Sequence, residues 1–311
     1  MPDDTPLHDI SHRKLVSLLV TARGDEDVPE WILNDESQRG TLEEALHSVQ
    51  ARAALRMNGK DLIRSMENSR CLPLGCTKID EMLQGGLLEG HLMEVFGDAG
   101  TGKTQLCHTA AAVTASRGER VIYIDTGNSF RASRLVSIIG NVSNTAFRRA
   151  EDALDCVTVL NVHRMDDLLH EMQQALKTST PSMIIIDCLG SLVAPTLGGV
   201  AYDAGHDVLS RMAMHLKRIA AEHHVAVLVT NYTIGGEYGQ PSGHLSSEDD
   251  AFYMKRAALG DTWVGQPHVR LQLVMHQDDT SHHQGSSRAR RAFLHQSTNM
   301  PSGACVDFDI Y

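Results

Sequence analysis

The residues best suited to chemistry form one glycine-rich segment. Residues 97–104 read Gly-Asp-Ala-Gly-Thr-Gly-Lys-Thr and fit GxxxxGK[ST], the pattern of a phosphate-binding loop, or P-loop. Its glycines let backbone N–H groups wrap around phosphates, and a helix opening at the end of the loop adds the positive end of its dipole. We expect Lys103 to reach the β and γ phosphates of ATP and the Thr104 hydroxyl to ligate Mg²⁺. The nucleotide-binding residues predicted from the motif are Gly97, Asp98, Ala99, Gly100, Thr101, Gly102, Lys103, Thr104 and Gln105.

An acidic residue that ends an apolar run supplies the second half of such a site. Residues 183–187 read Met-Ile-Ile-Ile-Asp, and in P-loop enzymes an Asp at the end of a buried strand helps to hold the magnesium ion. Lys103, Thr104 and Asp187 are therefore the predicted catalytic residues, with Thr104 and Asp187 as the metal ligands.

The elements that must position these residues alternate along the chain. Near-continuous apolar runs, typical of parallel strands buried on both faces, alternate with helical patterns and predict an α/β fold with a mostly parallel central sheet. Apolar residues at helical spacing between 207 and 219 predict a crossover helix. Later runs predict an antiparallel extension of the sheet, and two polar segments, 233–250 and 276–290, predict loops. The predicted strands are 92–96, 121–125, 157–160, 183–187, 225–230, 269–274, 292–294 and 304–310.

The N-terminal part has a different composition. Residues 10–19 and 42–49 have helical spacing and are separated by a polar segment. We predict a small helical domain with a linker over residues 1–68, followed by the core over residues 69–311.

Composition limits the functional classes. The net charge of −11 argues against a broad nucleic-acid-binding surface, since phosphate contacts need Lys and Arg gathered on one face. The 6 cysteines and 17 histidines show no metal-ligand spacing. The sequence has no apolar run long enough to span a membrane and no signal peptide, so we expect a soluble intracellular protein.

Several motifs resemble one family. The segment 74–87, Leu-Gly-Cys-Thr-Lys-Ile-Asp-Glu-Met-Leu-Gln-Gly-Gly-Leu, together with 90–97 before the P-loop, resembles the RecA-like core of eukaryotic and archaeal recombinases. The resemblance spans roughly residues 70 to 310 and continues in 101–108, 123–135 and 228–231. Residues 187–199 and 258–263 are similar to paralogues of the strand-exchange recombinase, the former to the D-type paralogue.

The resemblance implies a function and further site residues. It implies a RecA-like ATPase in a hetero-oligomer with other paralogues, which assists the main recombinase on single-stranded or branched DNA during homologous-recombination repair in the nucleus. It also implies that Arg134 stacks on adenine, although an exposed helix arginine is the alternative, and that Asn231 senses the γ-phosphate. No Phe-x-x-Ala tether occurs in residues 50–75, which favours hetero-assembly over long homofilaments.

Two departures from the family pattern affect mechanism. Gly127 stands where active recombinases carry the glutamate that positions the attacking water, and Tyr232 stands where a glutamine often senses the γ-phosphate. Loss of a water-orienting group commonly lowers the rate by about two to four orders of magnitude. We therefore expect ATP binding with slow turnover.

The basic residues predict at most local DNA contact. The first predicted DNA loop, 195–207, contains no Lys or Arg, and the second, 233–256, contains only Lys255 and Arg256. Aromatic residues in the second loop could stack on bases, but a solvated loop is an equal alternative. A C-terminal cluster could face DNA or a neighbour's nucleotide, or could simply favour solubility. Its members are Arg288, Arg290 and Arg291.

Three functional hypotheses follow. The first is a weak, DNA-stimulated ATPase in a recombination-mediator complex. The second is a non-catalytic scaffold in which ATP stabilises assembly, and Gly127 favours it. The third is a different RecA-like motor such as a helicase, since a fold does not fix function.

Overall fold

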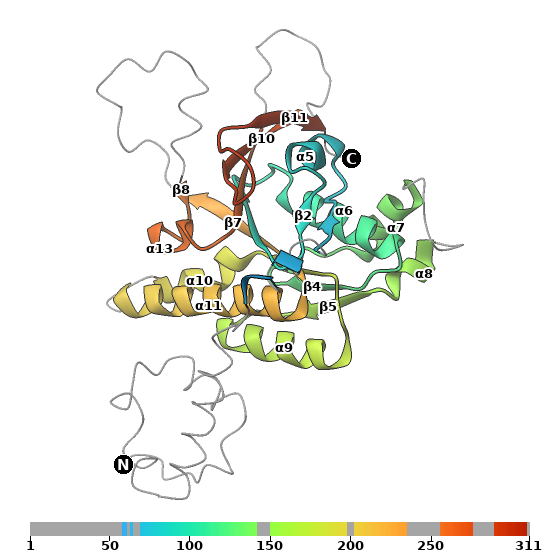
Figure 1. Cartoon of the computed structure of the whole chain (residues 1–311). Coiled ribbons are helices and arrows are strands. Elements are labelled where there is room, and N and C mark those ends of the chain that lie inside the picture. The colour runs from blue at the N-terminus through green and yellow to red at the C-terminus, as the bar shows by residue number, and fades with distance from the viewer. Residues whose placement is uncertain are drawn as a thin grey trace, which may run out of the picture. The chain divides into compact units, whose positions relative to one another are not determined.

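The computed structural model describes residues 58–60, 63–64, 69–141, 150–197, 202–234, 256–275 and 289–309. The chain divides into two compact units: residues 1–68 with 164–174, and residues 69–163 with 175–311. The second unit contains the central sheet and the P-loop (Figure 1). The predicted N-terminal helices lie outside the described residues. No described helix is long and apolar enough to cross a membrane.

One 9-stranded sheet forms the centre of the second unit, and β3 lies between β9 and β7. The ladders from β9 through β3, β7, β6 and β4 to β5 are all parallel. Every residue of β3, β4 and β6 is buried, as expected for parallel strands covered on both faces. Strand β8 (Arg256–Ala257) pairs with β7 off the main path, and the other strands follow in this order across the sheet: β11 (Cys305–Asp309), β10 (Ala289–Gln296), β9 (Val269–Met275), β3 (Leu92–Gly97), β7 (Ala226–Ile234), β6 (Met183–Asp187), β4 (Val121–Asp125) and β5 (Val157–Asn161).

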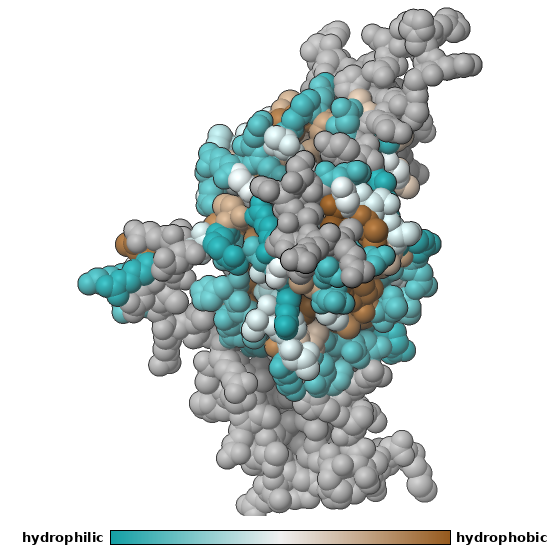
Figure 2. Space-filling model, turned by 90° about the vertical axis from the view of Figure 1, so that its right-hand side faces the viewer, coloured by the Kyte–Doolittle hydropathy of each residue, from teal (hydrophilic) through white to brown (hydrophobic). Residues whose placement is uncertain are grey.

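Helices connect the parallel strands. Crossovers between parallel strands are right-handed, so the direction in which the chain crosses the sheet decides which face a helix covers. The chain moves outward from β3 to β4 and β5 and then returns to β6 and β7. Helices α6 and α7 therefore cover one face, and α10 and α11 cover the other (Figure 1). The turned view in Figure 2 shows hydrophilic residues around the rim of the described surface and hydrophobic ones toward its middle. The longer helices are α6 (Lys103–Ser116), α7 (Ala132–Asn141), α9 (Met165–Thr178), α10 (Leu189–Leu197) and α11 (Tyr202–His223), and the shorter ones are α5 (Thr77–Met82), α8 (Ala150–Leu154) and α13 (Asp261–Val264).

The predicted antiparallel extension is confirmed. Strand β10 pairs antiparallel with both β9 and β11. Strand β9, the first of the strands predicted for the extension, runs parallel to β3. Antiparallel pairing begins between β9 and β10. A short strand not predicted from the sequence, β8 (Arg256–Ala257), pairs antiparallel with the end of β7.

The first predicted DNA loop was too long. Helix α10 extends through Leu197 and α11 begins at Tyr202, so much of the predicted 195–207 loop is helical. The apolar residues Leu189, Leu192, Val193 and Leu197 do recur at helical spacing. Pro195, which favours a helix end, and the glycines that follow it suggested a loop instead.

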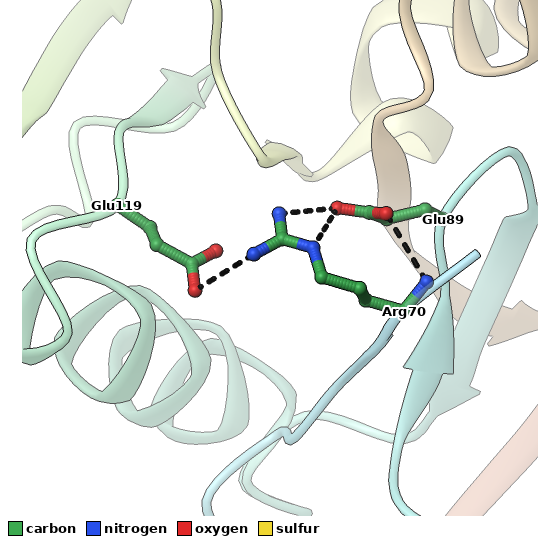
Figure 3. A network of polar contacts seen from close by, with 3 residues as sticks. All are labelled: Arg70, Glu89 and Glu119. Atoms are coloured by element: carbon green, nitrogen blue, oxygen red, sulfur yellow. Dashed lines mark hydrogen bonds and ion pairs between the residues drawn. The ribbon is translucent and has the colours of Figure 1, made fainter. Parts of the chain in front are cut away.

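The segment before the P-loop is fixed by polar contacts. Strands β1 (Cys71–Leu72) and β2 (Leu87–Leu88) pair antiparallel, and Arg70 donates to Glu89 through Nη2 at 2.6 Å and Nε at 3.1 Å. Figure 3 shows the same guanidinium reaching Glu119, with 3.4 Å between Nη1 and Oε1. The arginine therefore ties the entry of the core to the turn after α6.

The motif 74–87 also has a structural explanation. The Asp80 carboxylate accepts from the backbone N–H groups of Leu74 at 2.7 Å and Gly75 at 3.0 Å. At Gly86 the φ angle is +120°, and a Cβ would lie 2.2 Å from the carbonyl oxygen of Leu72. Only glycine fits there, because the β2 entry passes against the backbone of β1.

Candidate nucleotide site

The P-loop joins the buried end of β3 to the first turn of α6. A Cβ at Gly97 would lie 2.2 Å from the carbonyl oxygen of Leu273 on β9, so the loop starts where only a hydrogen fits. Gly102 is the N-cap of α6 with φ of 101°, a conformation that glycine adopts without strain. The loop consequently presents the N-terminus of a 14-residue helix to any anion that it holds.

Lys103 folds back over the loop. Its Nζ donates to the carbonyl oxygens of Gly97 and Asp98, each at 2.7 Å. Burial lowers the pKa of Lys103, while the nearby Cys188, Asp187 and Asp98 oppose that shift. The ammonium is thus held inside the loop, close to the predicted metal ligand.

Two other elements contact the loop. The Thr233 hydroxyl, near the end of β7, donates to the Asp98 carboxylate. Arg290, at the start of β10, donates from Nη2 to the carbonyl oxygen of Gly100 at 3.3 Å. Within the loop, Thr101 Oγ1 donates to the Asp98 carbonyl at 2.9 Å. Side chains of β7, a neighbour of β3, and of β10, the strand beyond β9, therefore support the loop.

Asp187 ends β6 inside a ring of hydroxyl groups. Thr230 Oγ1 donates to its Oδ1 at 2.6 Å, and Tyr123 Oη and Ser129 Oγ donate to its Oδ2 at 3.0 and 3.4 Å. Asp187 is 4% exposed. Burial raises the pKa of Tyr123, and the charges of Cys107 and Asp187 add to this shift, so the phenol remains a donor to Asp187. The Thr104 hydroxyl and the Asp187 carboxylate are hard oxygen donors of the kind that Mg²⁺ prefers.

The turn after β4 contains the Gly127 departure. Asp125 Oδ1 accepts from the backbone N–H groups of Gly127 at 3.1 Å and Ser129 at 3.0 Å, and Oδ2 accepts from that of Phe130 at 2.8 Å. Burial opposes ionisation, but these hydrogen bonds outweigh it and lower the pKa of Asp125. The Asp125 carboxylate therefore stabilises the turn after β4 through these hydrogen bonds. A Cβ at Gly127 would meet no heavy atom within 4 Å.

Asn231 lies in a buried polar cluster beneath the P-loop. Its Nδ2 donates to Glu94 Oε1 at 2.8 Å, and Arg270 Nε donates to Glu94 Oε2 at 2.6 Å. Glu94 and Asn231 are both 0% exposed, and the Arg270 guanidinium lies 4.9 Å from the centroid of the Phe96 ring. Strands β7, β3 and β9 are thus joined by side chains as well as by their ladders. We call Glu94, Asn231 and Arg270 the platform cluster.

Arg134 and the predicted DNA-contacting cations lie in different places. Arg134 Nε donates to Gln105 Oε1 at 3.0 Å, which puts it beside the first turn of α6. Arg256 is exposed on β8, and Arg291 pairs with Asp307 through Nε and Oδ1 at 2.6 Å. Lys255 and Arg288 lie outside the described residues.

Sequence reasoning missed several members of this site. Tyr123, Ser129 and Thr230 around Asp187, and Thr233 and Arg290 around the P-loop, were not assigned to it. Tyr123 and Thr230 could have been found from their position near the carboxyl ends of predicted strands, where the ligands of open α/β sheets bind. No local signal marks Arg290, because its partner lies 190 residues away.

Comparison with known proteins identifies the family. Residues 67–252 match the Rad51 family. The chain belongs to the Rad51 family. It is 30% identical over 270 residues to DNA repair protein RAD51 homolog 4 of Mus musculus, covering 83% of this chain and 76% of that protein. The Bos taurus protein of the same name is 29% identical over 269 residues, covering 83% and 77%.

A third relative matches a shorter stretch. DNA repair protein rhp51 of Schizosaccharomyces pombe is 31% identical over 170 residues, which cover 51% of this chain and 46% of that protein. The Rad51 family membership confirms the predicted RecA-like fold and implies nucleotide binding with Mg²⁺.

Proposed function

We propose that this Rad51-family chain is an accessory subunit of a homologous-recombination DNA repair complex. It binds ATP with Mg²⁺, hydrolyses it weakly, and assists assembly of the recombinase filament on single-stranded DNA in the nucleus. The observation that carries the proposal is a complete P-loop with Gly127 at the turn after β4. The similarity to proteins named RAD51 homolog 4 supports the accessory role.

We assign the binding and hydrolysis of ATP to a small number of residues. Lys103 moves from the Gly97 and Asp98 carbonyls to the β and γ phosphates, and the backbone N–H groups of the loop bind the same oxygens. A magnesium ion held by Thr104 and Asp187 would neutralise charge on these phosphates. Asn231, whose amide bonds to Glu94 beneath the P-loop, senses the γ-phosphate from within β7. No carboxylate at position 127 orients the attacking water, which explains slow turnover.

We also propose how the rest of the chain contributes. Residues 1–68 form the helical arm that binds other paralogues, and residues 69–311 form the ATPase core. In the sequence, Lys255 and Arg256 stand at the end of the second predicted DNA loop, and Arg288, Arg290 and Arg291 form the basic cluster at the end of the predicted loop 276–290. Their charge suits a weak contact with DNA phosphates.

The proposal is tested by measuring binding and turnover separately. Purified full-length chain is titrated with Mg-ATP, and steady-state hydrolysis is measured with and without single-stranded DNA. Lys103→Ala serves as the blank and should weaken ATP binding by about tenfold or more, since it removes a charge-assisted contact. We expect slow turnover above that blank and stimulation by DNA.

The scaffold hypothesis has one specific observation in its favour. Position 127 carries no side chain that could orient water, and Asp125 is engaged in closing the turn. Binding of ATP without turnover above the blank would favour this hypothesis. If Lys103→Ala leaves complex assembly intact but abolishes repair, the scaffold hypothesis is wrong. Failure to bind ATP contradicts both hypotheses.

A further inference from the structure

Arg290 reaches the P-loop of its own chain. It begins the antiparallel part of the sheet, where its register partner on β9 is Met275. Leu273, two residues earlier on β9, is the register partner of Gly97. The start of β10 therefore lies at the same edge of the sheet as the P-loop, and Arg290 Nη2 comes within 3.3 Å of the Gly100 carbonyl oxygen.

Both terminal nitrogens of the Arg290 guanidinium form hydrogen bonds. Arg290 Nη1 also donates to the carbonyl oxygen of Ala289 at 2.9 Å, so the guanidinium is anchored to its own strand while it holds the loop. Arg290 is half-buried. A planar guanidinium with two anchors has little freedom left to move.

The hydrogen bond between Arg290 and the Gly100 carbonyl also orients backbone N–H groups of the P-loop. In a trans peptide the C=O group and the following N–H group point in opposite directions. Lys103 holds the carbonyls of Gly97 and Asp98, and Arg290 holds that of Gly100. Fixing these carbonyls fixes the peptide planes of the loop, whose N–H groups are the ligands of the phosphates.

We propose that Arg290 is a positioning residue of the nucleotide site, which acts within its own chain by holding the Gly100 carbonyl and so presetting the P-loop for the phosphates of ATP. The inference rests on the proposed function, because it requires that the chain bind ATP. It assigns to Arg290 a task that is independent of DNA and of a neighbouring subunit. The fixed positive charge of the guanidinium also attracts the phosphates.

The chain supplies a matched control in the next residue. Arg291 carries the same charge on the same strand, but its side chain points to the opposite face and pairs with Asp307 through Nε at 2.6 Å and Nη2 at 3.2 Å. Replacing either arginine changes the net charge equally. A difference between the two variants therefore reports the P-loop contact.

The test compares full-length wild type, Arg290→Ala, Arg290→Lys and Arg291→Ala for binding of the fluorescent analogue mant-ATP with Mg²⁺. We expect Arg290→Ala to bind about tenfold more weakly, since a charge-assisted hydrogen bond is lost. In the absence of DNA, the mant-ATP affinity of Arg291→Ala should stay within about twofold of wild type, because its side chain does not contact the P-loop. Arg290→Lys retains the charge and a donor and should recover most of the affinity.

Thermal unfolding separates positioning from a merely structural role. Without nucleotide, Arg290→Ala and Arg291→Ala should unfold at similar temperatures, while the rise in unfolding temperature on adding Mg-ATP should be smaller for Arg290→Ala. Equal affinities of the two alanine variants would overturn the inference, as would an Arg290→Lys variant no better than Arg290→Ala. If wild type binds no better than Lys103→Ala, the proposed function itself fails.

Discussion

The P-loop and the turn after β4 follow buried parallel strands at one edge of the sheet, but they use their polar groups differently. In the P-loop, carbonyl oxygens are held by Lys103 and Arg290, and the N-terminus of α6 is directed at the same place. In the turn after β4, the Asp125 carboxylate accepts hydrogen bonds from the backbone N–H groups of Gly127, Ser129 and Phe130. In the proposed function, one region supplies the groups that bind a triphosphate, while Gly127 in the other offers no side chain to activate water. The proposal therefore assigns binding and turnover to separate segments.

The first prediction tests the platform cluster beneath the P-loop, which has no counterpart in the contacts described for the turn after β4. Arg270→Ala leaves the Glu94 carboxylate buried without its ion-pair partner, so the free energy of unfolding should fall by about 3–5 kcal/mol. Urea denaturation of the full-length chain measures this loss. Arg291→Ala, which breaks the more exposed pair with Asp307, should cost about 1 kcal/mol or less. Equal losses in the two variants would show that the platform cluster does not support the sheet.

The second prediction concerns the carboxylate that is absent from position 127 in the turn after β4. Gly127→Glu places a carboxylate where a side chain meets open space, so steady-state ATP turnover should rise about tenfold or more. Affinity for Mg-ATP should change little, because the P-loop is untouched. Gly127→Ala controls for backbone effects and should leave turnover unchanged. An unchanged rate in Gly127→Glu would place the limit on turnover elsewhere.

The third prediction concerns the amino end of β3, opposite the P-loop. His268 Nδ1 accepts from the backbone N–H of Leu92 at 2.9 Å, and burial, with the charges of His91 and Lys217, lowers the pKa of His268 to about 4. The unfolded imidazole has its ordinary pKa of 6.5, so between these values the unfolded state binds more protons. The free energy of unfolding should therefore fall as pH drops from about 6.5 to about 4.

The size of this effect is measured against a variant. In His268→Asn the fall over this pH range should be smaller by about 1 kcal/mol, a figure discounted for partial exposure of the ring. Asp80, whose pKa burial raises to about 6, acts in the opposite direction in both proteins and cancels in the difference. ATP binding at neutral pH should not change. A pH dependence identical to that of wild type would contradict the assignment.

The sequence predicted the parallel strands well, because burial on both faces demands uninterrupted apolar residues. The predicted runs 121–125 and 183–187 coincide with β4 and β6. The P-loop also followed from the sequence, since it is a local motif between a strand and a helix. The prediction was weaker where strands are half-exposed: the run 292–294 is only the centre of β10, which spans Ala289–Gln296.

The contacts around the site could not be predicted, because they depend on strand order. Nothing in the sequence near Arg270 specifies that β9 lies beside β3, or that Glu94 is its partner 176 residues away. The contact between Arg290 and Gly100 depends on the same order. Asp98 and Thr233 meet only because β7 is the other neighbour of β3.

Strand β7 contacts the P-loop, the platform cluster and β8 along its last residues. Its 9 residues run from Ala226 to Ile234; Asn231 is bonded to Glu94, Thr233 to the P-loop, and Ile234 to β8. Thr233 is also the first residue of the second predicted DNA loop, so the segment predicted to contact DNA begins on the strand whose side chain holds Asp98 of the P-loop.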